Sequence, residues 1–264
     1  MTAARRTVTV WQDRVPLTVH VEGTGPALVY FHGPWGLTWD PFLDALAQTF
    51  TVYAPEHPGT TPGEPDAVQH VDGLWDLVLC YDELLEHLRL AEAVLVGHSF
   101  GGMVACEMAA LRPSRARRLA LIDPIGLWRD ETPVTNWMLV APSELPGYVF
   151  SDPGGFAAKA LFAVPEDPEE AAVARTRLTW AMGSTGKFIW PIPDKGLKKR
   201  IHRVTSPTLL VWGQEDRLVP ASYADVFAHR LPHSRTEVVK GAGHAPHMEH
   251  PETVTRLIQS FVTG

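Results

Sequence analysis

The chain has 264 residues, of which 45% are hydrophobic and 20% are charged, and its formal net charge is −7 at pH 7. This is the composition of a folded globular protein, and a chain of this length can bury a sizeable core without disulfide or metal staples. The acidic balance argues against nucleic acid or an anionic membrane as a partner. We therefore expect a small-molecule substrate, with neither a nucleic acid nor a membrane as partner.

The two cysteines, Cys80 and Cys106, form neither a disulfide framework nor a CxxC metal motif. The N-terminus has no apolar stretch of signal-peptide length, and no apolar run in the sequence is long enough to span a bilayer. These features predict a cytoplasmic protein.

The predicted elements alternate between strands and helices along the chain. Residues 7–11 and 17–21 alternate polar and apolar side chains with period two, which predicts a β-hairpin. Short, continuously apolar runs follow, as expected for strands buried on both faces, at 27–31, 51–54, 93–96, 119–122 and 208–212. Helix-like stretches separate them, at 41–48, 73–88, 102–111, 221–230 and 251–261. This alternation predicts an α/β fold with a doubly wound, mostly parallel sheet.

One region interrupts the alternation. From about 124 to 200 no buried strand is evident, whereas aromatic residues, prolines and glycines are frequent. We expect a mostly helical insertion, or lid, between two strands of the sheet. The whole chain, 1–264, is then a single domain that carries this lid.

The strongest chemical signal is Gly97-His98-Ser99-Phe100-Gly101, between a predicted buried strand and a predicted helix. Glycines flank the serine because the chain turns sharply there, and larger side chains would collide. The turn lifts the Ser99 hydroxyl above the sheet edge, close to a helix N-terminus that favours negative charge. The pattern predicts a nucleophile.

A serine nucleophile needs a base, and the base needs an acid that orients it. With this motif the acid and then the histidine are expected downstream of the serine. Asp216 follows the strand at 208–212, and His244 follows a strand-like segment at 236–239. Both therefore lie at the edge of the sheet where the carboxyl ends of the strands meet, which is where open α/β sheets bind ligands.

The motif at Gly97 to Gly101, together with Gly213 to Asp216, Gly243-His244 and His32-Gly33, resembles the signature of the α/β-hydrolase superfamily. The resemblance covers about 17–122 and 204–262, but not the insertion. It implies the α/β-hydrolase fold and a serine hydrolase that works through an acyl-enzyme without cofactor or metal. It does not imply a particular substrate.

Other residues compete for these roles. Asp123 ends the strand at 119–122, where some members of the superfamily place their acid, and Glu215 precedes Asp216. His244, His247 and His250 are spaced by threes, but Pro246 and Pro251 interrupt the helix that would align them, and no carboxylate cluster accompanies them. We therefore expect no metal site and interpret His247 and His250 as surface or capping residues.

The oxyanion hole requires two N–H donors. The amide of Phe100, directly after the nucleophile, should be one. The second normally follows the His-Gly pair, but that residue is Pro34, which has no N–H. We expect Trp35 to donate in its place. His32 and His98 are expected to hold the loops by hydrogen bonds.

The reaction expected from these residues is hydrolysis of a carboxylic ester of a small apolar or aromatic substrate. Trp39, Trp128 and Trp137 are the candidate pocket residues. The alternative is hydrolysis of a C–C bond in a diketone-like substrate, although relatives with that activity tend to have asparagine at the position of His98 and a longer glycine-rich loop. A binding protein without catalysis is a second alternative, which an intact triad disfavours.

Overall fold

The computed structural model describes residues 3–264, and within that range eight strands form one sheet in the order β1-β2-β4-β3-β5-β6-β7-β8. The antiparallel part consists of the hairpin of β1 (Ala4–Val10) and β2 (Val15–Glu22), together with the pairing of β2 with β4 (Thr51–Pro55). All the other pairings are parallel. After β4 the parallel strands follow one another across the sheet in the order β3 (Ala27–Phe31), β5 (Ala93–His98), β6 (Ala116–Ile122), β7 (Thr208–Gly213) and β8 (Ser234–Val239). The predicted α/β fold with a mostly parallel sheet is confirmed.

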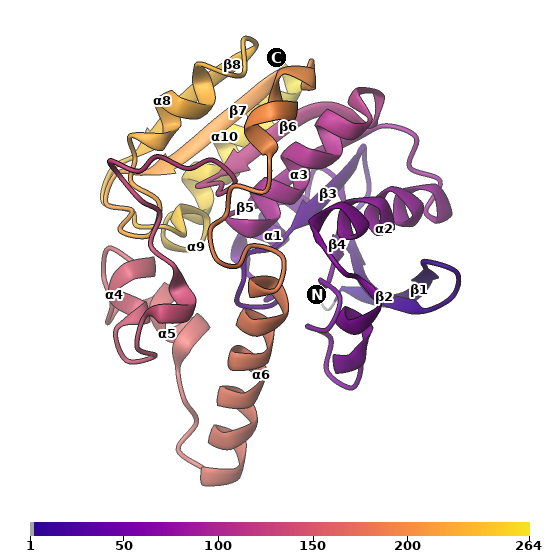
Figure 1. Cartoon of the computed structure of the whole chain (residues 1–264). Coiled ribbons are helices and arrows are strands. Elements are labelled where there is room, and N and C mark those ends of the chain that lie inside the picture. The colour runs from indigo at the N-terminus through magenta and orange to yellow at the C-terminus, as the bar shows by residue number, and fades with distance from the viewer. Residues whose placement is uncertain (1–2) are drawn as a thin grey trace.

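Helices cover both faces of the sheet (Figure 1). Because side chains alternate along a strand, Leu28 and Tyr30 of β3 join one apolar cluster, whereas Val29 and Phe31 join the other. The first cluster includes α1 (Pro41–Ala47) and α10 (Pro251–Thr263). The second includes α2 (Leu74–His87), α3 (Phe100–Leu111) and α8 (Tyr223–Ala228). Two covered faces explain why the central strands β3, β5 and β7 are apolar at nearly every position, whereas the edge strands β1 and β8 carry exposed polar residues.

The connection from β6 to β7 contains the predicted insertion, and residues 124–200 form no strand. Its helices are α4 (Leu145–Val149), α5 (Phe156–Phe162), α6 (Pro168–Gly186) and α7 (Leu197–Arg200). Single 3-10 turns lie at η3 (Trp137–Leu139) and η4 (Ile201–Arg203). Outside the insertion are η1 (Pro65–His70), η2 (Pro113–Arg115) and the short helix α9 (Pro246–Glu249).

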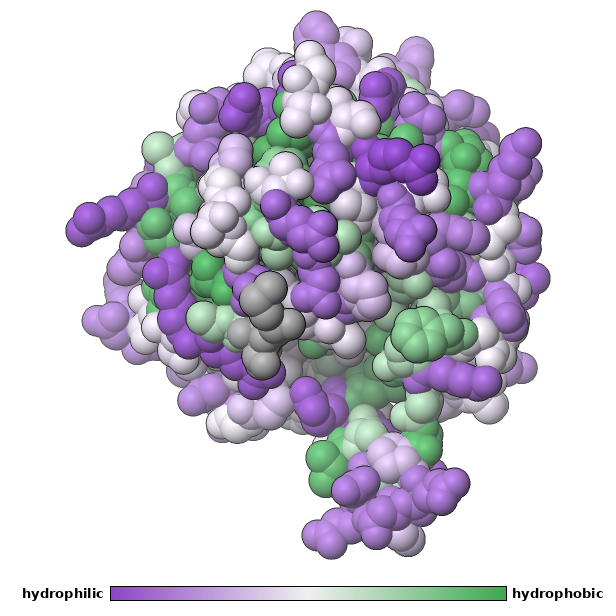
Figure 2. Space-filling view, turned by 180° about the vertical axis from the view of Figure 1, so that it is seen from behind, coloured by the Kyte–Doolittle hydropathy of each residue, from purple (hydrophilic) through white to green (hydrophobic). Residues whose placement is uncertain are grey.

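The longest helix, α6, projects from the body of the protein (Figure 1). Asp167 caps it by accepting hydrogen bonds from the backbone N–H groups of Glu169 and Glu170, both at 3.0 Å. Figure 2 shows this projection from behind, with hydrophilic side chains at its tip and apolar ones nearer the body. Across residues 3–264, no helix combines the length and the apolar character needed to cross a membrane.

A buried ion pair fixes the returning end of the insertion to the sheet-covering helix α3. Glu107 of α3 is 1% exposed. Its carboxylate accepts two hydrogen bonds from Arg200, from Nε at 2.8 Å and from Nη2 at 2.6 Å. Such a bidentate arrangement combines charge with a defined orientation.

Removal of the arginine should therefore destabilise the protein strongly. Arg200→Met leaves the Glu107 carboxylate buried without a partner, and we expect the free energy of unfolding in urea to fall by roughly 3–5 kcal/mol. Glu107→Gln should cost less than half as much, because the Arg200 side chain is 32% exposed and can be hydrated. Equal losses in the two variants would show that the desolvated carboxylate is not the dominant cost.

Candidate active site

Ser99 lies in the tight turn between β5 and α3, in a strained backbone conformation with φ 54° and ψ −114°. A Cβ added at Gly101 would lie 2.0 Å from the Phe31 carbonyl oxygen, and one added at Gly97 would lie 2.2 Å from the Gly101 carbonyl oxygen. Only glycine fits at these two positions, because real Cβ atoms do not approach backbone so closely. The turn therefore requires the residue pattern seen in the sequence.

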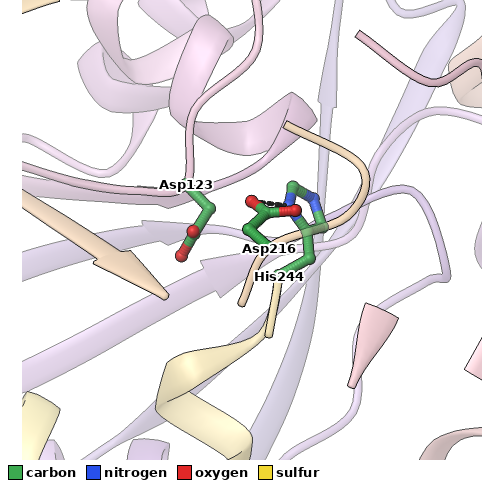
Figure 3. A group of neighbouring side chains, drawn as sticks. All are labelled: Asp123, Asp216 and His244. Carbon is green, nitrogen blue, oxygen red and sulfur yellow. Dashed lines mark hydrogen bonds and ion pairs between the residues drawn. The ribbon is translucent and has the colours of Figure 1, made fainter. Parts of the chain in front are cut away.

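The structure brings Ser99, His244 and Asp216 together from three different loops. The Ser99 hydroxyl lies 2.7 Å from Nε2 of His244. On the other side of the ring, Nδ1–H of His244 donates to Oδ2 of Asp216 at 2.7 Å (Figure 3). Oδ1 of Asp216 accepts the backbone N–H groups of Leu218 and Val219, each at 2.8 Å. This arrangement can pass a proton from a hydroxyl to an imidazole that a fixed carboxylate orients.

The two rival acids do not contact the imidazole. Asp123 is fully buried, but its Oδ1 accepts the N–H of Gly213 at 2.9 Å. Glu215 is exposed to solvent. Asp123, Asp216 and His244 each place a potential metal-ligand atom within 4.8 Å of the others. In this structure, however, His244 uses Nδ1 for its hydrogen bond to Asp216, and that nitrogen cannot at the same time bind a cation.

The three residues are enclosed. Ser99 and His244 are 0% exposed, and the Asp216 side chain is too. The start of the insertion packs directly on the histidine loop, where the His244 N–H donates to the Val149 carbonyl at 2.7 Å. Its later part packs on the helix after the serine, where the ring of Phe188 stacks on Phe100 with centroids 6.1 Å apart.

The candidate oxyanion donors are free to bind. Within residues 3–264, neither the backbone N–H of Phe100 nor that of Trp35 has a hydrogen-bond partner. The first N–H groups of a helix are left without an intrahelical partner, which accounts for Phe100 at the start of α3.

The loop at 32–40, between β3 and α1, carries the candidate donor Trp35 and is called the oxyanion loop below. Of the three tryptophans expected in the pocket, the structure places one beside it. The Trp137 ring packs edge-on against Trp35, with centroids 6.0 Å apart, and Trp35 packs in the same way on Phe162 at 5.6 Å. Trp39 instead stacks on His20 and donates to Asp44, and Trp128 donates to Asp130 beside α8. The indole N–H groups of Trp39 and Trp128 make these local hydrogen bonds, which the hydropathy of the sequence does not predict.

A cavity of about 200 Å³ lies between the oxyanion loop and the helices α5 and α6 of the insertion. Its apolar lining is Trp35, Leu37, Leu161, Ala174, Leu178 and Ala181, and its polar lining includes Glu56, Thr60 and Arg177. None of the three predicted pocket residues, Trp39, Trp128 and Trp137, lines it. Leu161 and Leu178 are the lining residues that sequence reasoning missed, since either would fit equally well in the insertion's own core.

Buried histidines surround the site, and the interpretation of His247 as a surface or capping residue is wrong. His247 is 3% exposed, and its Nε2 lies 3.3 Å from the Tyr30 hydroxyl. His98 donates to the His244 carbonyl at 2.8 Å, and His32 donates to the Gly33 carbonyl at 2.7 Å, so both hold loops as expected. His250, in contrast, is partly exposed.

His57 is a further member of this group that sequence reasoning missed. It is 0% exposed, and its ring packs edge-on against Phe100 with centroids 4.9 Å apart. Nε2–H donates to the His32 carbonyl at 2.9 Å, while Nδ1 accepts the Tyr81 hydroxyl. In the sequence His57 is followed by proline and glycine, which indicates only a turn.

Burial keeps these histidines neutral. It lowers the pKa of His57 to about 4 and, together with the nearby His244, the pKa of His247 to about 3. Burial, followed by the neighbouring histidines, also lowers the pKa of His32 and of His98 well below the usual range. The unfolded chain would bind protons on all four rings below roughly pH 6.5, whereas the native state would not.

The protein should therefore lose stability as the pH falls from 7 to 5. At pH 5, His57 and His247 should each cost about 2 kcal/mol of unfolding free energy relative to pH 7. Two carboxyl groups oppose them: burial raises the pKa of Asp40 to about 6, so its protonation favours the native state by about 1 kcal/mol, and the raised pKa of Asp123 acts in the same direction. Urea titrations at pH 7, 6 and 5 measure the net loss. His247→Gln should reduce the loss of unfolding free energy between pH 7 and pH 5, whereas the control His250→Gln should leave that loss unchanged. An unchanged loss in His247→Gln would contradict the lowered pKa assigned to His247.

Comparisons with known proteins agree with the fold. A model described as "Alpha/beta hydrolase family" matches residues 28–257. A pimeloyl-(acyl-carrier protein) methyl ester esterase from Aeromonas hydrophila subsp. hydrophila is 28% identical over 264 residues, covering 93% of this chain and 100% of that protein.

Two solved structures show the same fold. An esterase from Exiguobacterium antarcticum has a TM-score of 0.78 and 18% identity, covering 99% of this chain and 100% of the other. A meta-cleavage product hydrolase from Pseudomonas fluorescens IP01 has a TM-score of 0.74 and 19% identity, covering 94% of each chain. At such identities the likeness concerns the fold alone.

Proposed function

Because the chain belongs to the alpha/beta hydrolase family, we propose that it is a carboxylic ester hydrolase with Ser99 as nucleophile, His244 as base and Asp216 as the orienting acid. The observation that carries the proposal is the pair of 2.7 Å contacts that join these three side chains in order. A similar protein is named as a methyl ester esterase, which supports an ester rather than another acyl bond.

The first half of the reaction forms an acyl-enzyme. Ser99 Oγ attacks the ester carbonyl while Nε2 of His244 takes its proton, and Asp216 stabilises the imidazolium that results. The negative charge on the carbonyl oxygen is held by the N–H groups of Phe100 and Trp35. Each such donor typically contributes about 3 kcal/mol to transition-state stabilisation, or on the order of a hundredfold in rate. His244 then gives its proton to the departing alcohol.

The second half repeats these steps with water. Water gives its proton to His244 as it attacks the acyl-enzyme, and the same two N–H groups hold the charge that develops. When the intermediate collapses, Ser99 recovers its proton from His244 and the carboxylic acid leaves.

Access to Ser99 requires part of the protein to move, since the nucleophile is fully buried. We assign this movement to the insertion, about 124–200, acting as a lid. Its contacts on the oxyanion loop include ring packings of Trp137 and Phe162 on Trp35 and a 3.5 Å hydrogen bond from the Thr185 hydroxyl to the Pro34 carbonyl. Such contacts can separate and close again without breaking an ion pair.

We propose that an apolar acyl or aryl group reaches from Ser99 into the cavity beside Trp35. There it would contact Leu161 and Leu178 rather than the polar lining residues Glu56, Thr60 and Arg177. At about 200 Å³ the cavity is small, so its capacity limits the length of chain that it can accept. Each methylene that it buries contributes about 0.8 kcal/mol.

Ser99→Ala tests the nucleophile. Only a hydroxyl is removed, so the circular dichroism spectrum and melting temperature should be retained, while turnover of a p-nitrophenyl ester should fall by at least about a thousandfold. A fluorophosphonate probe should label the wild type and not this variant. Residual turnover above a tenth of wild type in a folded variant would exclude Ser99 as nucleophile.

A series of p-nitrophenyl esters tests the substrate class. We expect kcat/KM to rise from acetate to butyrate by on the order of tenfold, because two more methylenes are buried, and to level off once the cavity is full. The matched control is Leu161→Ala, which enlarges the cavity and should move the optimum to a longer chain. A value that is highest for acetate, or faster turnover of a diketone than of any ester, would contradict the proposed substrate class.

A further inference from the structure

A second carboxyl group lies next to the proposed triad, and the reaction as described does not use it. Asp123 follows β6 directly and is 0% exposed. Figure 3 shows its carboxyl beside that of Asp216, which in turn bonds to His244. The three side chains approach one another within 4.8 Å, so the two carboxyl groups share one buried environment.

The backbone around Asp123 is held firmly. Its N–H donates to the Val211 carbonyl at 3.0 Å, and the neighbouring Ile122 carbonyl accepts the Ser99 N–H at 2.9 Å. Asp123 itself has a φ of 43°, a left-handed conformation that aspartate, asparagine and glycine adopt more readily than other residues. The carboxyl group is therefore fixed both to the strand that carries the triad acid and to the turn that carries the serine.

The hydrogen bonds of Asp123 and Asp216 leave one oxygen on each carboxyl group able to share a proton with the other. Oδ1 of Asp123 accepts the Gly213 N–H, whereas its buried Oδ2 has no partner in the described part of the chain. Asp216 accepts three hydrogen bonds, from Leu218, Val219 and His244. An ionised carboxylate offers about four acceptor positions, so one remains.

Two ionised carboxylates so close together in a buried site would repel each other strongly. Burial, followed by the charge of Asp216, raises the pKa of Asp123 well above its usual range, and Glu249 acts in the same direction. The titratable groups that face Asp123 are thus Asp216, His244 and Glu249. Among them, His244 would be the sole cation, and only while it holds the serine proton.

We infer that Asp123 is a positioning residue, whose neutral carboxyl donates a hydrogen bond from Oδ2 to the Asp216 carboxylate and holds that carboxylate against His244. This inference rests on the proposed function of the triad. The donor also disperses part of the negative charge of Asp216, and so limits how strongly the imidazolium form of His244 is favoured before substrate arrives. No proton leaves Asp123 during the reaction.

Two substitutions at Asp123 test the hydrogen bond to Asp216, since both variants are neutral at this position and only one keeps a donor. Asp123→Asn keeps an oxygen that accepts from Gly213 and an N–H that donates to Asp216, so kcat and the acid limb of the kcat/KM profile should match wild type within about twofold. Asp123→Gly fits the left-handed backbone but removes the donor to Asp216, together with the oxygen that accepts the Gly213 N–H. We expect its kcat to fall on the order of tenfold, the size expected for a lost hydrogen bond to a charged group, with little change in KM. Its acid limb should move to higher pH, because Asp216 then favours the imidazolium form more strongly.

A downfield proton NMR signal from the His244–Asp216 hydrogen bond gives a readout that needs no ester turnover. It should be unchanged in Asp123→Asn and displaced in Asp123→Gly, even if the protein hydrolyses no ester. The acid limb moving to lower pH in both variants would show that Asp123 is ionised. A kcat, an acid limb and an NMR signal in Asp123→Gly that match wild type would show that Asp123 does not position Asp216. A loss in Asp123→Asn as large as in Asp216→Asn, which should be on the order of ten-thousandfold, would make Asp123 the triad acid instead.

Discussion

The close approach of backbone around Ser99 is the constraint on which the rest of the site depends. Gly101 packs so tightly that an added Cβ would lie 2.0 Å from the Phe31 carbonyl oxygen, and this contact joins α3 to the end of β3. The Ser99 N–H bonds to Ile122, and the Ser99 carbonyl accepts the N–H of Ile125, which ties the same turn to β6. The proposed nucleophile, the candidate donor Phe100 and the neighbouring Asp123 are therefore placed by one turn.

Local chemistry explains why much of the fold could be predicted. The central strands are apolar at nearly every position because both faces of the sheet are covered there, and this pattern is visible without knowing which strands pair. The turn at Ser99 needs small residues at fixed offsets, which gives a short and specific motif. Asp216 follows β7 and His244 follows β8, so their place at one edge of the sheet follows from the parallel topology. The structure brings both to Ser99.

Features that depend on distant contacts could not be predicted. His247 looks polar in the sequence, yet it is buried against Tyr30, which is 217 positions away along the chain. The roles of Trp39 and Trp128 are decided by hydrogen bonds to Asp44 and Asp130, not by their apolar surface. In the sequence both Asp123 and Asp216 are candidates for the acid because each follows a strand, and the segment Gly213 to Asp216 favours Asp216. The direction of the His244 ring decides between them.

The enclosed site combines many ionisable groups with few charges. Four histidines around His244 are held neutral by burial, and on our inference Asp123 is neutral as well. Asp216 then contributes a single negative charge within the triad, and formation of the imidazolium cancels it at the moment the serine loses its proton. In a buried setting that interaction is stronger than in water, and neutral neighbours do not weaken it by opposing charge. If the insertion acts as the proposed lid, the packing that keeps water from this setting must open for each substrate and close again before the reaction.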